Sequence, residues 1–376
     1  MKESVSIFFC GDVMPGGVLP YQDSFIDNTL KEYMSKFDFR IGTLECAIGT
    51  NLPPAPEKLK ENGGNNNVCF ARDEDFYRIK ELGFNAVSLG NNHSFDLGEE
   101  GLRNTIWHLK ENGIGYFGAG LNKQEASDPL VVEFGGTKIA FIGCCIKGLS
   151  PRSLIAASDN SYGVYQPTIE ELVEQIKEIR ILYNYIVVMP HWGEEHIRIP
   201  PVENVNYSKR MIDAGADAIF GSHSHCLAPT VSYKGKPIYY GMGNFLDPDK
   251  CLFPPRPFYY PKEKSEIERL PKCINYPWSV KHATLCICGK DSRLGLAVTA
   301  TFGNGIKTNH KIVRLGEDNV LRWYSAYCRA KNFIVSRFIM PMAALLTDST
   351  LYSYIYRIAF LYERRIRNLG DFRKNI

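Results

Sequence analysis

The chain has 376 residues, of which 44% are hydrophobic and 12% aromatic, so it can bury one large core or two small ones. Lys and Arg number 44 against 41 Asp and Glu, a net charge of +3. This composition excludes a disordered chain, and so small a charge excludes a general polyanion-binding surface, including bulk nucleic-acid binding. The 11 cysteines include no Cys-x-x-Cys pair, which indicates a reducing compartment.

We expect neither an export signal nor a membrane span. The apolar run before Gly11-Asp12 is shorter than a signal peptide needs. The longest apolar stretch, residues 333–346, is interrupted by Ser336, Arg337 and Pro341, whereas a span needs about 20 consecutive apolar residues. The sequence therefore predicts a cytoplasmic protein, at most peripheral at the inner membrane face.

Apolar runs and turn residues predict alternating strands and helices. In chain order we expect strands at 4–10 and 39–44, a surface loop at 51–67, a helix at 73–82, a strand at 84–89, a helix at 98–112, and a hairpin turning at 135–136. A helix at 168–183, a strand at 186–189, a helix at 204–214, a strand at 218–220 and a hairpin at 231–240 follow. This mixture favours an α/β layered sandwich.

The last third of the chain changes character twice. Residues 247–280 are rich in Pro and Tyr and are predicted to be a long loop, followed by further strands within 282–315. We place one domain at 1–320 and a helical C-terminal extension with a basic tail at 321–376.

Side chains that bind metals follow five of the apolar runs directly. They are Asp12, Glu45, the triplet Asn91-Asn92-His93, His191, and the pair His223 and His225. Ligands gather at the carboxyl ends of strands in α/β sheets, so these donors predict a metal site. Carboxylate, amide and imidazole donors without thiolate fit one or two Mn, Fe, Zn or Mg ions.

Two further predictions concern the residues around these donors. His93 follows an amide ligand, and its ordinary pKa of about 6.5 suits protonation of a leaving group. Asp96 and Glu99 form a capping-box pattern for the helix that follows. We interpret His108, His196, His282 and His310 as surface or core histidines without a role in the site.

Six motifs in this order make the sequence resemble the CapA (poly-gamma-glutamate capsule synthesis, PGA_cap) family of the calcineurin-like metallophosphoesterase superfamily. The resemblance spans residues 5 to about 250. The motifs are Gly11-Asp12-Val13-Met14, Leu44-Glu45, residues 90–98, His191-Trp192-Gly193-Glu194-Glu195, residues 221–225, and residues 241–245.

The resemblance implies a four-layer αββα sandwich with a two-metal cleft at one end of its sheets. Glu45 would bridge the ions, Asn92, His191 and His223 would complete one position, and Asp12 and His225 would hold the other. It also places His93 and Glu195 in the catalytic role and Asn91, Trp192 and Asn244 near the substrate.

The motifs depart from the superfamily pattern at two positions. Met14 stands where the superfamily has a histidine ligand, and Glu45 stands where it has a bridging aspartate. A thioether is a poor donor for a hard cation, so the first metal position is expected to be weakened.

Three functions remain open. The first is a metal-dependent hydrolase of capsule or exopolymer metabolism, of the poly-gamma-glutamate type, which cleaves an amide or a phosphoester bond. The second is a non-catalytic component of capsule assembly, and the third is a cytosolic metallophosphodiesterase. The expected partners are an anionic polymer or a small phosphoester.

The basic C-terminal segment around Arg364, Arg365 and Arg367 also has two interpretations. It contacts a membrane surface or the capsule machinery, or it packs on the sandwich and ends in a solvated tail.

Overall fold

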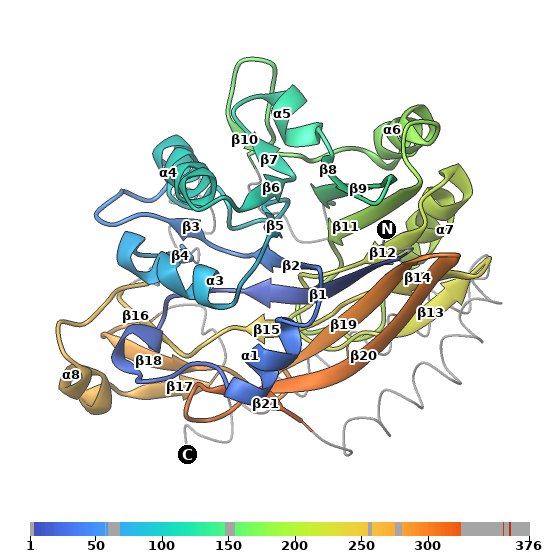
Figure 1. The fold of residues 1–376 in the computed structure, drawn as a ribbon. Coiled ribbons are helices and arrows are strands. Elements are labelled where there is room, and N and C mark those ends of the chain that lie inside the picture. The colour runs from blue at the N-terminus through green and yellow to red at the C-terminus, as the bar shows by residue number, and fades with distance from the viewer. Residues whose placement is uncertain are drawn as a thin grey trace.

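The computed structural model describes residues 4–56, 58, 68–146, 155–254, 258–274, 280–324, 356 and 361. Two β-sheets lie at the centre of the molecule (Figure 1). The larger has the order β21-β20-β19-β1-β2-β5-β6, with β15 beside the end of β1. Its strands are β1 (Val5–Val13), β2 (Phe39–Leu44), β5 (Ala86–Ser88), β6 (Gly115–Phe117), β15 (Asn244–Leu246), β19 (Leu294–Gly303), β20 (Gly305–Leu315) and β21 (Leu321–Trp323).

The second sheet has the order β13-β14-β12-β11-β9-β8. Its strands are β8 (Leu130–Phe134), β9 (Thr137–Cys145), β11 (Tyr185–His191), β12 (Ala218–Phe220), β13 (Thr230–Tyr233) and β14 (Lys236–Tyr239). Three small sheets flank the two large ones. They pair β16 (Lys250–Leu252) and β17 (Lys272–Ile274) with β18 (Thr284–Ile287), β3 (Ala47–Ile48) with β4 (Phe70–Ala71), and β7 (Ala119–Gly120) with β10 (Gly163–Val164).

The helices are short and lie outside the sheets (Figure 1). They are α1 (Asn28–Met34), α3 (Tyr77–Glu81), α4 (Gly98–Glu111), α5 (Lys123–Ser127), α6 (Ile169–Ile179), α7 (Val202–Ala214) and α8 (Lys264–Arg269). Two 3-10 turns, Leu19–Tyr21 and Asp73–Phe76, complete them.

The central strand β1 is buried on both faces, which explains its continuous apolar run. Successive side chains of a strand point to opposite faces. Ile7 and Phe9 therefore pack between the two sheets. There the Phe9 ring stacks on that of Phe220 of β12, with 4.2 Å between the ring centroids. Phe8 and Cys10 pack on the other side, in a core that includes Leu30 of α1 and residues of α3 and α4.

The second sheet is covered in the same way. Leu172 and Ile176 of α6 and Met211 of α7 pack on Ile186 and Val188 of β11. Helices, sheet, sheet and helices thus follow one another in four layers, and the predicted αββα sandwich is confirmed.

The sequence prediction was wrong between residues 247 and 280. The expected loop contains β16, α8 and β17, and the two strands pair with β18. Each of these strands is three residues long. These strands form because their backbones hydrogen-bond to β18, which is distant in the sequence. Local composition carries no signal for such pairing, so the sequence predicted a loop.

The C-terminal prediction is largely outside the described residues. β21 still pairs with β20, so the large sheet continues to Trp323. The predicted helices beyond it fall on 325–355, 357–360 and 362–376, which are not described.

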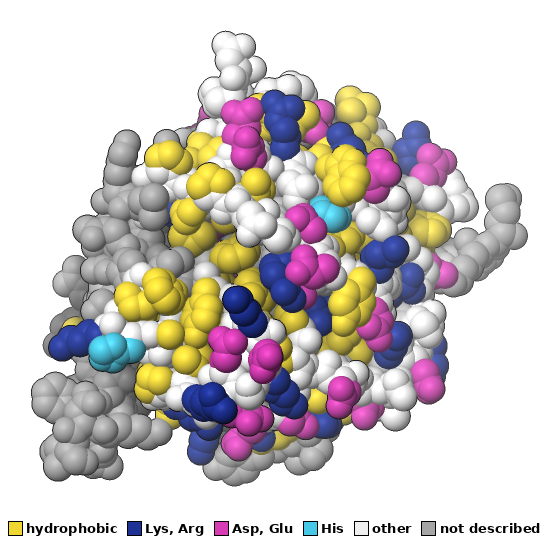
Figure 2. Space-filling model, turned by 90° about the vertical axis from the view of Figure 1, so that its left-hand side faces the viewer, with side chains coloured by type: hydrophobic (Ala, Val, Ile, Leu, Met, Phe, Trp, Pro, Cys, Tyr) yellow, Lys and Arg dark blue, Asp and Glu magenta, His cyan; other side chains and the backbone are white. Residues whose placement is uncertain are grey.

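One face of the molecule is mixed in charge. On the side seen in Figure 2, which carries α8, Lys and Arg side chains lie among Asp and Glu. Among the described residues, no helix has both the length and the apolar character that crossing a membrane requires.

Candidate metal centre

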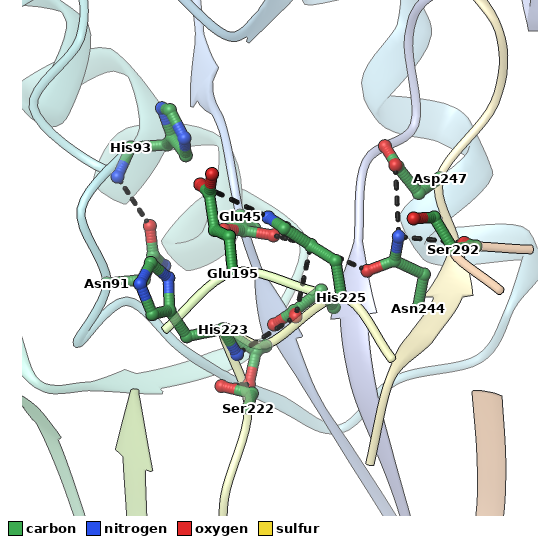
Figure 3. A network of polar contacts seen from close by, with 12 residues as sticks. Glu45, Asn91, His93, Glu195, Ser222, His223, His225, Asn244, Asp247 and Ser292 are labelled. Atoms are coloured by element: carbon green, nitrogen blue, oxygen red, sulfur yellow. Dashed lines mark hydrogen bonds and ion pairs between the residues drawn. The ribbon is translucent and has the colours of Figure 1, made fainter. Parts of the chain in front are cut away.

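The predicted donors meet at one edge of the sandwich. β1, β2 and β5 are parallel in the first sheet, and β11 and β12 are parallel in the second, so their carboxyl ends lie together. The pairing of His191 with Ser222 continues the second sheet into the loop that carries His223 and His225. Figure 3 shows Glu45 and Glu195 turned toward His225.

One donor group is built from both sheets. His191 Nε2 lies 3.2 Å from Glu45 Oε1 and 2.6 Å from Asn92 Oδ1. His223 Nδ1 lies 3.0 Å from the same His191 nitrogen. Glu45, His191 and His223 offer ligand atoms within 4.8 Å of one another. The structure therefore brings together the four side chains expected at this position.

A second donor group shares Glu45 with the first. His225 Nδ1 lies 3.6 Å from Glu45 Oε2 and 3.8 Å from Asp12 Oδ2. Asp12, Glu45 and His225 also offer ligand atoms within 4.8 Å of one another. Because one oxygen of Glu45 faces each group, its carboxylate is placed to bridge two ions.

Buried carboxylate oxygens without a well-aligned hydrogen bond show that these groups fit a cation. Asp12 Oδ1 and Glu45 Oε1 are buried and form no well-aligned hydrogen bond within the described ranges, and the nitrogens of His191 lie 3.8 Å from the first oxygen and 3.2 Å from the second. A buried carboxylate oxygen without a hydrogen bond is costly. A divalent ion would satisfy both carboxylates, so the residues present fit a metal.

Burial and neighbouring charges shift the pKa values of the donors in different directions. Burial raises the pKa of the Asp12 carboxyl well above its usual range, and the neighbouring Glu45 adds to this. Burial also favours neutral Glu45, but the charges of His225 and His191 outweigh it and hold the pKa of Glu45 well below its usual range. Although burial alone would lower the pKa of His225, the carboxylates of Glu45, Glu195 and Asp12 raise it to about 10.

His93 lies beside the centre and is oriented by Asp96. Its Nδ1 is 2.7 Å from Asp96 Oδ2, and its charge contributes to the low pKa of Glu45. The same Asp96 oxygen accepts from the Cys69 backbone N–H at 2.7 Å, and Lys58 Nζ lies 2.8 Å from Asp96 Oδ1.

The capping-box prediction for Asp96 was wrong. α4 begins at Gly98, its N-cap is Leu97, and no side chain caps it. Gly98 has φ +67°, which turns the chain so that the carboxylate of Asp96 points inward to His93. An acidic residue three positions after His93 was the available sequence signal, and helix capping was the competing explanation.

The predicted substrate-binding residues are buried and occupied by contacts within the protein. Asn91 donates to Leu44 O at 2.8 Å and accepts from the His93 N–H at 2.9 Å. Trp192 is 1% exposed, donates to Tyr240 O at 2.9 Å, and packs beneath α7. Both side chains thus help to hold the loops in place, and their contact with a substrate stays a prediction.

Glu195, Asn244 and His196 surround His225. Glu195 Oε1 lies 3.7 Å from His225 Nε2, and its side chain is 26% exposed, so it is accessible to a substrate. Asn244 is 2% exposed and lies on the opposite side of the ring. The His196 ring lies 5.6 Å from the His225 ring, so this histidine borders the site although the sequence did not indicate it. His108, by contrast, pairs with Asp73 at 2.9 Å.

Fold and donor groups together define an αββα protein with a candidate two-position metal centre. The family model described as "Bacterial capsule synthesis protein PGA_cap" matches residues 6–249. The chain therefore belongs to this capsule synthesis family, as the six motifs predicted.

Curated relatives agree with this assignment. The capsule biosynthesis protein CapA of Bacillus anthracis is 27% identical over 251 residues, which cover 65% of this chain and 60% of that protein. The PGA biosynthesis protein CapA of Bacillus subtilis strain 168 is 31% identical over 169 residues, 45% of this chain and 44% of that protein. The matches thus span less than two thirds of either relative.

Solved structures with similar coordinates include two named for phosphate chemistry. A structure titled as a novel phosphatase, from Mycoplasma pneumoniae, has a TM-score of 0.45 and 17% identity, covering 84% of this chain and 95% of that one. The NAD nucleotidase of Haemophilus influenzae has a TM-score of 0.41 and 14% identity, and the match covers 97% of this chain and 61% of that one.

Proposed function

We propose that this protein is a metal-dependent hydrolase that acts on an anionic polymer of the capsule or exopolymer, of the poly-gamma-glutamate type. Its membership of a capsule synthesis family supports the biological setting. The single observation that carries the hydrolytic role is Glu45, whose two oxygens each face a separate donor group, with His93 beside them. The bond cleaved is an amide or a phosphoester.

A divalent ion held there would polarise a substrate oxygen and lower the pKa of a water molecule. Asp12, Glu45, Asn92, His191, His223 and His225 are the residues that would hold it. Glu195, the most exposed acid beside the donors, would orient a donor group of the substrate. In this proposal a substrate would bind at the donors with its reacting bond near His93.

His93 supplies the proton for the leaving group. Burial opposes the charge of Asp96, but Lys58 and His93 outweigh burial and lower the pKa of its carboxyl, so Asp96 is an ionised acceptor. Nδ1 of His93 must therefore carry the hydrogen, and Nε2 is the nitrogen that exchanges its proton. A positioned acid of this kind contributes about 100-fold to 10,000-fold to a rate.

The test uses the full chain loaded with Mn²⁺ and two substrates, poly-γ-glutamate and an aryl phosphodiester. The wild type should hydrolyse one of them, and His93→Ala should lower kcat by about 100-fold or more while it keeps its metal content. His282→Ala, at an exposed histidine, serves as the matched control and should leave kcat unchanged. Equal activity of His93→Ala and wild type would remove His93 from the mechanism.

Two alternatives are tested by the same preparation. Met14, which stands where the superfamily has a histidine ligand beside Asp12, favours a non-catalytic assembly component, because a thioether is a poor donor for a hard cation. Protein that contains no ion after metal loading, and that hydrolyses neither substrate, would establish that role. Turnover of the aryl phosphodiester alone would favour the metallophosphodiesterase. Contact of the basic C-terminal segment with a membrane or the capsule machinery stays a prediction.

A further inference from the structure

Asn244 lies next to the candidate metal centre, at the start of β15. It is the direct register partner of Asp12 in the parallel pair β1 and β15, and its side chain is 2% exposed. Two paired strands thus place an amide and a carboxylate side by side at the edge where the donors converge.

The hydrogen bonds of Asn244 settle which end of its amide faces the centre. The amide nitrogen lies 3.1 Å from Asp247 Oδ2 and 2.9 Å from the Ser292 carbonyl oxygen (Figure 3). Both of these atoms accept hydrogen bonds, so the nitrogen must face them. Lys250, buried and ion-paired with Asp247, anchors this carboxylate in turn. The amide oxygen is therefore held toward the metal centre.

Three oxygens from three residues converge on one nitrogen of His225. Nδ1 lies 2.9 Å from Asn244 Oδ1, 3.6 Å from Glu45 Oε2 and 3.8 Å from Asp12 Oδ2. Asp12, Glu45 and His225 make up the second donor group, so Asn244 presents a fourth donor to it. Met14 cannot take that place, because its side chain packs in the hydrophobic core.

We propose that Asn244 Oδ1 is a direct ligand of the ion held by Asp12, Glu45 and His225. This inference rests on the proposed function, in that it requires the centre to bind an ion. It deepens that function because Asn244 would complete the second donor group, the one expected to be weakened by Met14, without a ligand from residue 14. Three oxygen donors and one imidazole favour a hard cation such as Mn²⁺ or Mg²⁺ over Zn²⁺ at this position.

The first test is a calorimetric titration of the metal-free full chain with Mn²⁺ alone. The wild type should bind two ions, and Asn244→Ala should weaken one of them by about 100-fold or more, beyond the usual effect of an outer partner of a ligand. Asn309→Ala, at an exposed asparagine of β20, is the matched control and should bind as the wild type does.

The second test separates a ligand from a residue that only orients His225, and it needs no variant. Anomalous diffraction from a crystal of the wild-type chain soaked in Mn²⁺ locates the ions directly. An ion within about 2.5 Å of Asn244 Oδ1 supports the inference, since oxygen ligands bind at about 2.0 to 2.6 Å. An ion beside Asp12 that leaves Oδ1 outside that distance overturns it.

The outcomes distinguish this inference from the function beneath it. Wild-type protein that binds no Mn²⁺ overturns the proposed function and the inference together. If the wild type binds two ions and Asn244→Ala binds both with unchanged affinity, the inference alone is overturned. The same holds if the wild type binds one ion and Asn244→Ala binds it equally well.

Discussion

Asp96 and Asp12 are both buried carboxylates at the candidate centre, yet their surroundings differ. Asp96 has a backbone N–H, the Lys58 ammonium and the His93 imidazole as partners, and the last two outweigh burial and lower the pKa of its carboxyl. Asp12 Oδ2 accepts a hydrogen bond from the His223 N–H at 3.1 Å, and Asp12 Oδ1, which forms no hydrogen bond within the described residues, lies 3.8 Å from His191 Nδ1. A structural carboxylate is thus paired within the protein, whereas Asp12 is suited to an added cation.

At the residue scale we predict that Asp96→Asn lowers both stability and activity. The substitution deprives the buried Lys58 of its ion pair, and breaking a buried pair costs about 3 kcal/mol. The neutral amide also no longer requires the hydrogen on Nδ1 of His93, so kcat should fall. Urea denaturation measures the free energy of unfolding, and a kinetic assay of Mn²⁺-loaded protein measures kcat.

The double variant Asp96→Asn with Lys58→Met separates these two effects. Removing the ammonium should restore part of the free energy of unfolding without restoring kcat, because His93 still lacks its ionised partner. Recovery of kcat together with stability would mean that Asp96 acts through folding alone.

At the element scale, the loop after β5 is held against the second sheet by a close backbone approach. A Cβ at Gly90 would lie 2.6 Å from the Cys144 backbone nitrogen of β9, closer than real Cβ atoms come. The residues that follow Gly90 are Asn91, Asn92 and His93. Contact between the sheets therefore sets the position of a ligand and of the proposed acid.

We predict that Gly90→Ala destabilises the fold by about 1 to 3 kcal/mol, as overpacking does, and also weakens Mn²⁺ binding. Thr168→Ala is the matched comparison. It removes the capping box of α6, in which Glu171 N–H donates to Thr168 Oγ1 at 3.2 Å, and should cost about 1 kcal/mol. Calorimetry should show wild-type Mn²⁺ affinity in Thr168→Ala and reduced affinity in Gly90→Ala. Equal affinity in both would show that the loop tolerates the added methyl group.

At the scale of the whole molecule, the candidate centre joins the two sheets. Asp12, Glu45 and Asn92 lie at or after the carboxyl ends of strands of the first sheet, and His191, His223 and His225 lie at or after those of the second. The phenyl rings of Phe9 and Phe220 stack between the same two sheets. An ion bound by both sets would therefore link the layers and stabilise only the folded state.

We predict that Mn²⁺ raises the Tm of the metal-free protein and that a chelator reverses this. A ligand at 100 times its Kd stabilises the folded state by about 2.7 kcal/mol.

Asp12→Asn should change the Tm differently in the metal-free and the Mn²⁺-loaded protein. Without metal it removes a buried carboxylate beside Glu45, so the Tm should rise or stay constant. With Mn²⁺ the shift in Tm should shrink, and calorimetric melting curves with and without the ion measure both. An unchanged Mn²⁺ shift in Asp12→Asn would exclude Asp12 as a ligand.

The sequence by itself indicated the sandwich and the side chains that the structure brings together at the candidate metal centre. β2 spans 39–44 and β12 spans 218–220, as predicted, because apolar runs with turn residues after them encode buried parallel strands locally. Each donor stands directly after such a run, so its approach to the others follows from the shared direction of parallel strands. These features need only neighbouring residues.

Only the tertiary structure decided how Asp96, Asn244 and Trp192 are oriented. The orientation of each depends on partners far away in the chain, such as Cys69 for Asp96, Ser292 for Asn244 and Tyr240 for Trp192. The strands between 247 and 280 also depend on pairing with β18. Local propensity carries no information about hydrogen bonds that form only when distant segments pack, and these contacts determine which polar side chains face a cation and which are buried in the core.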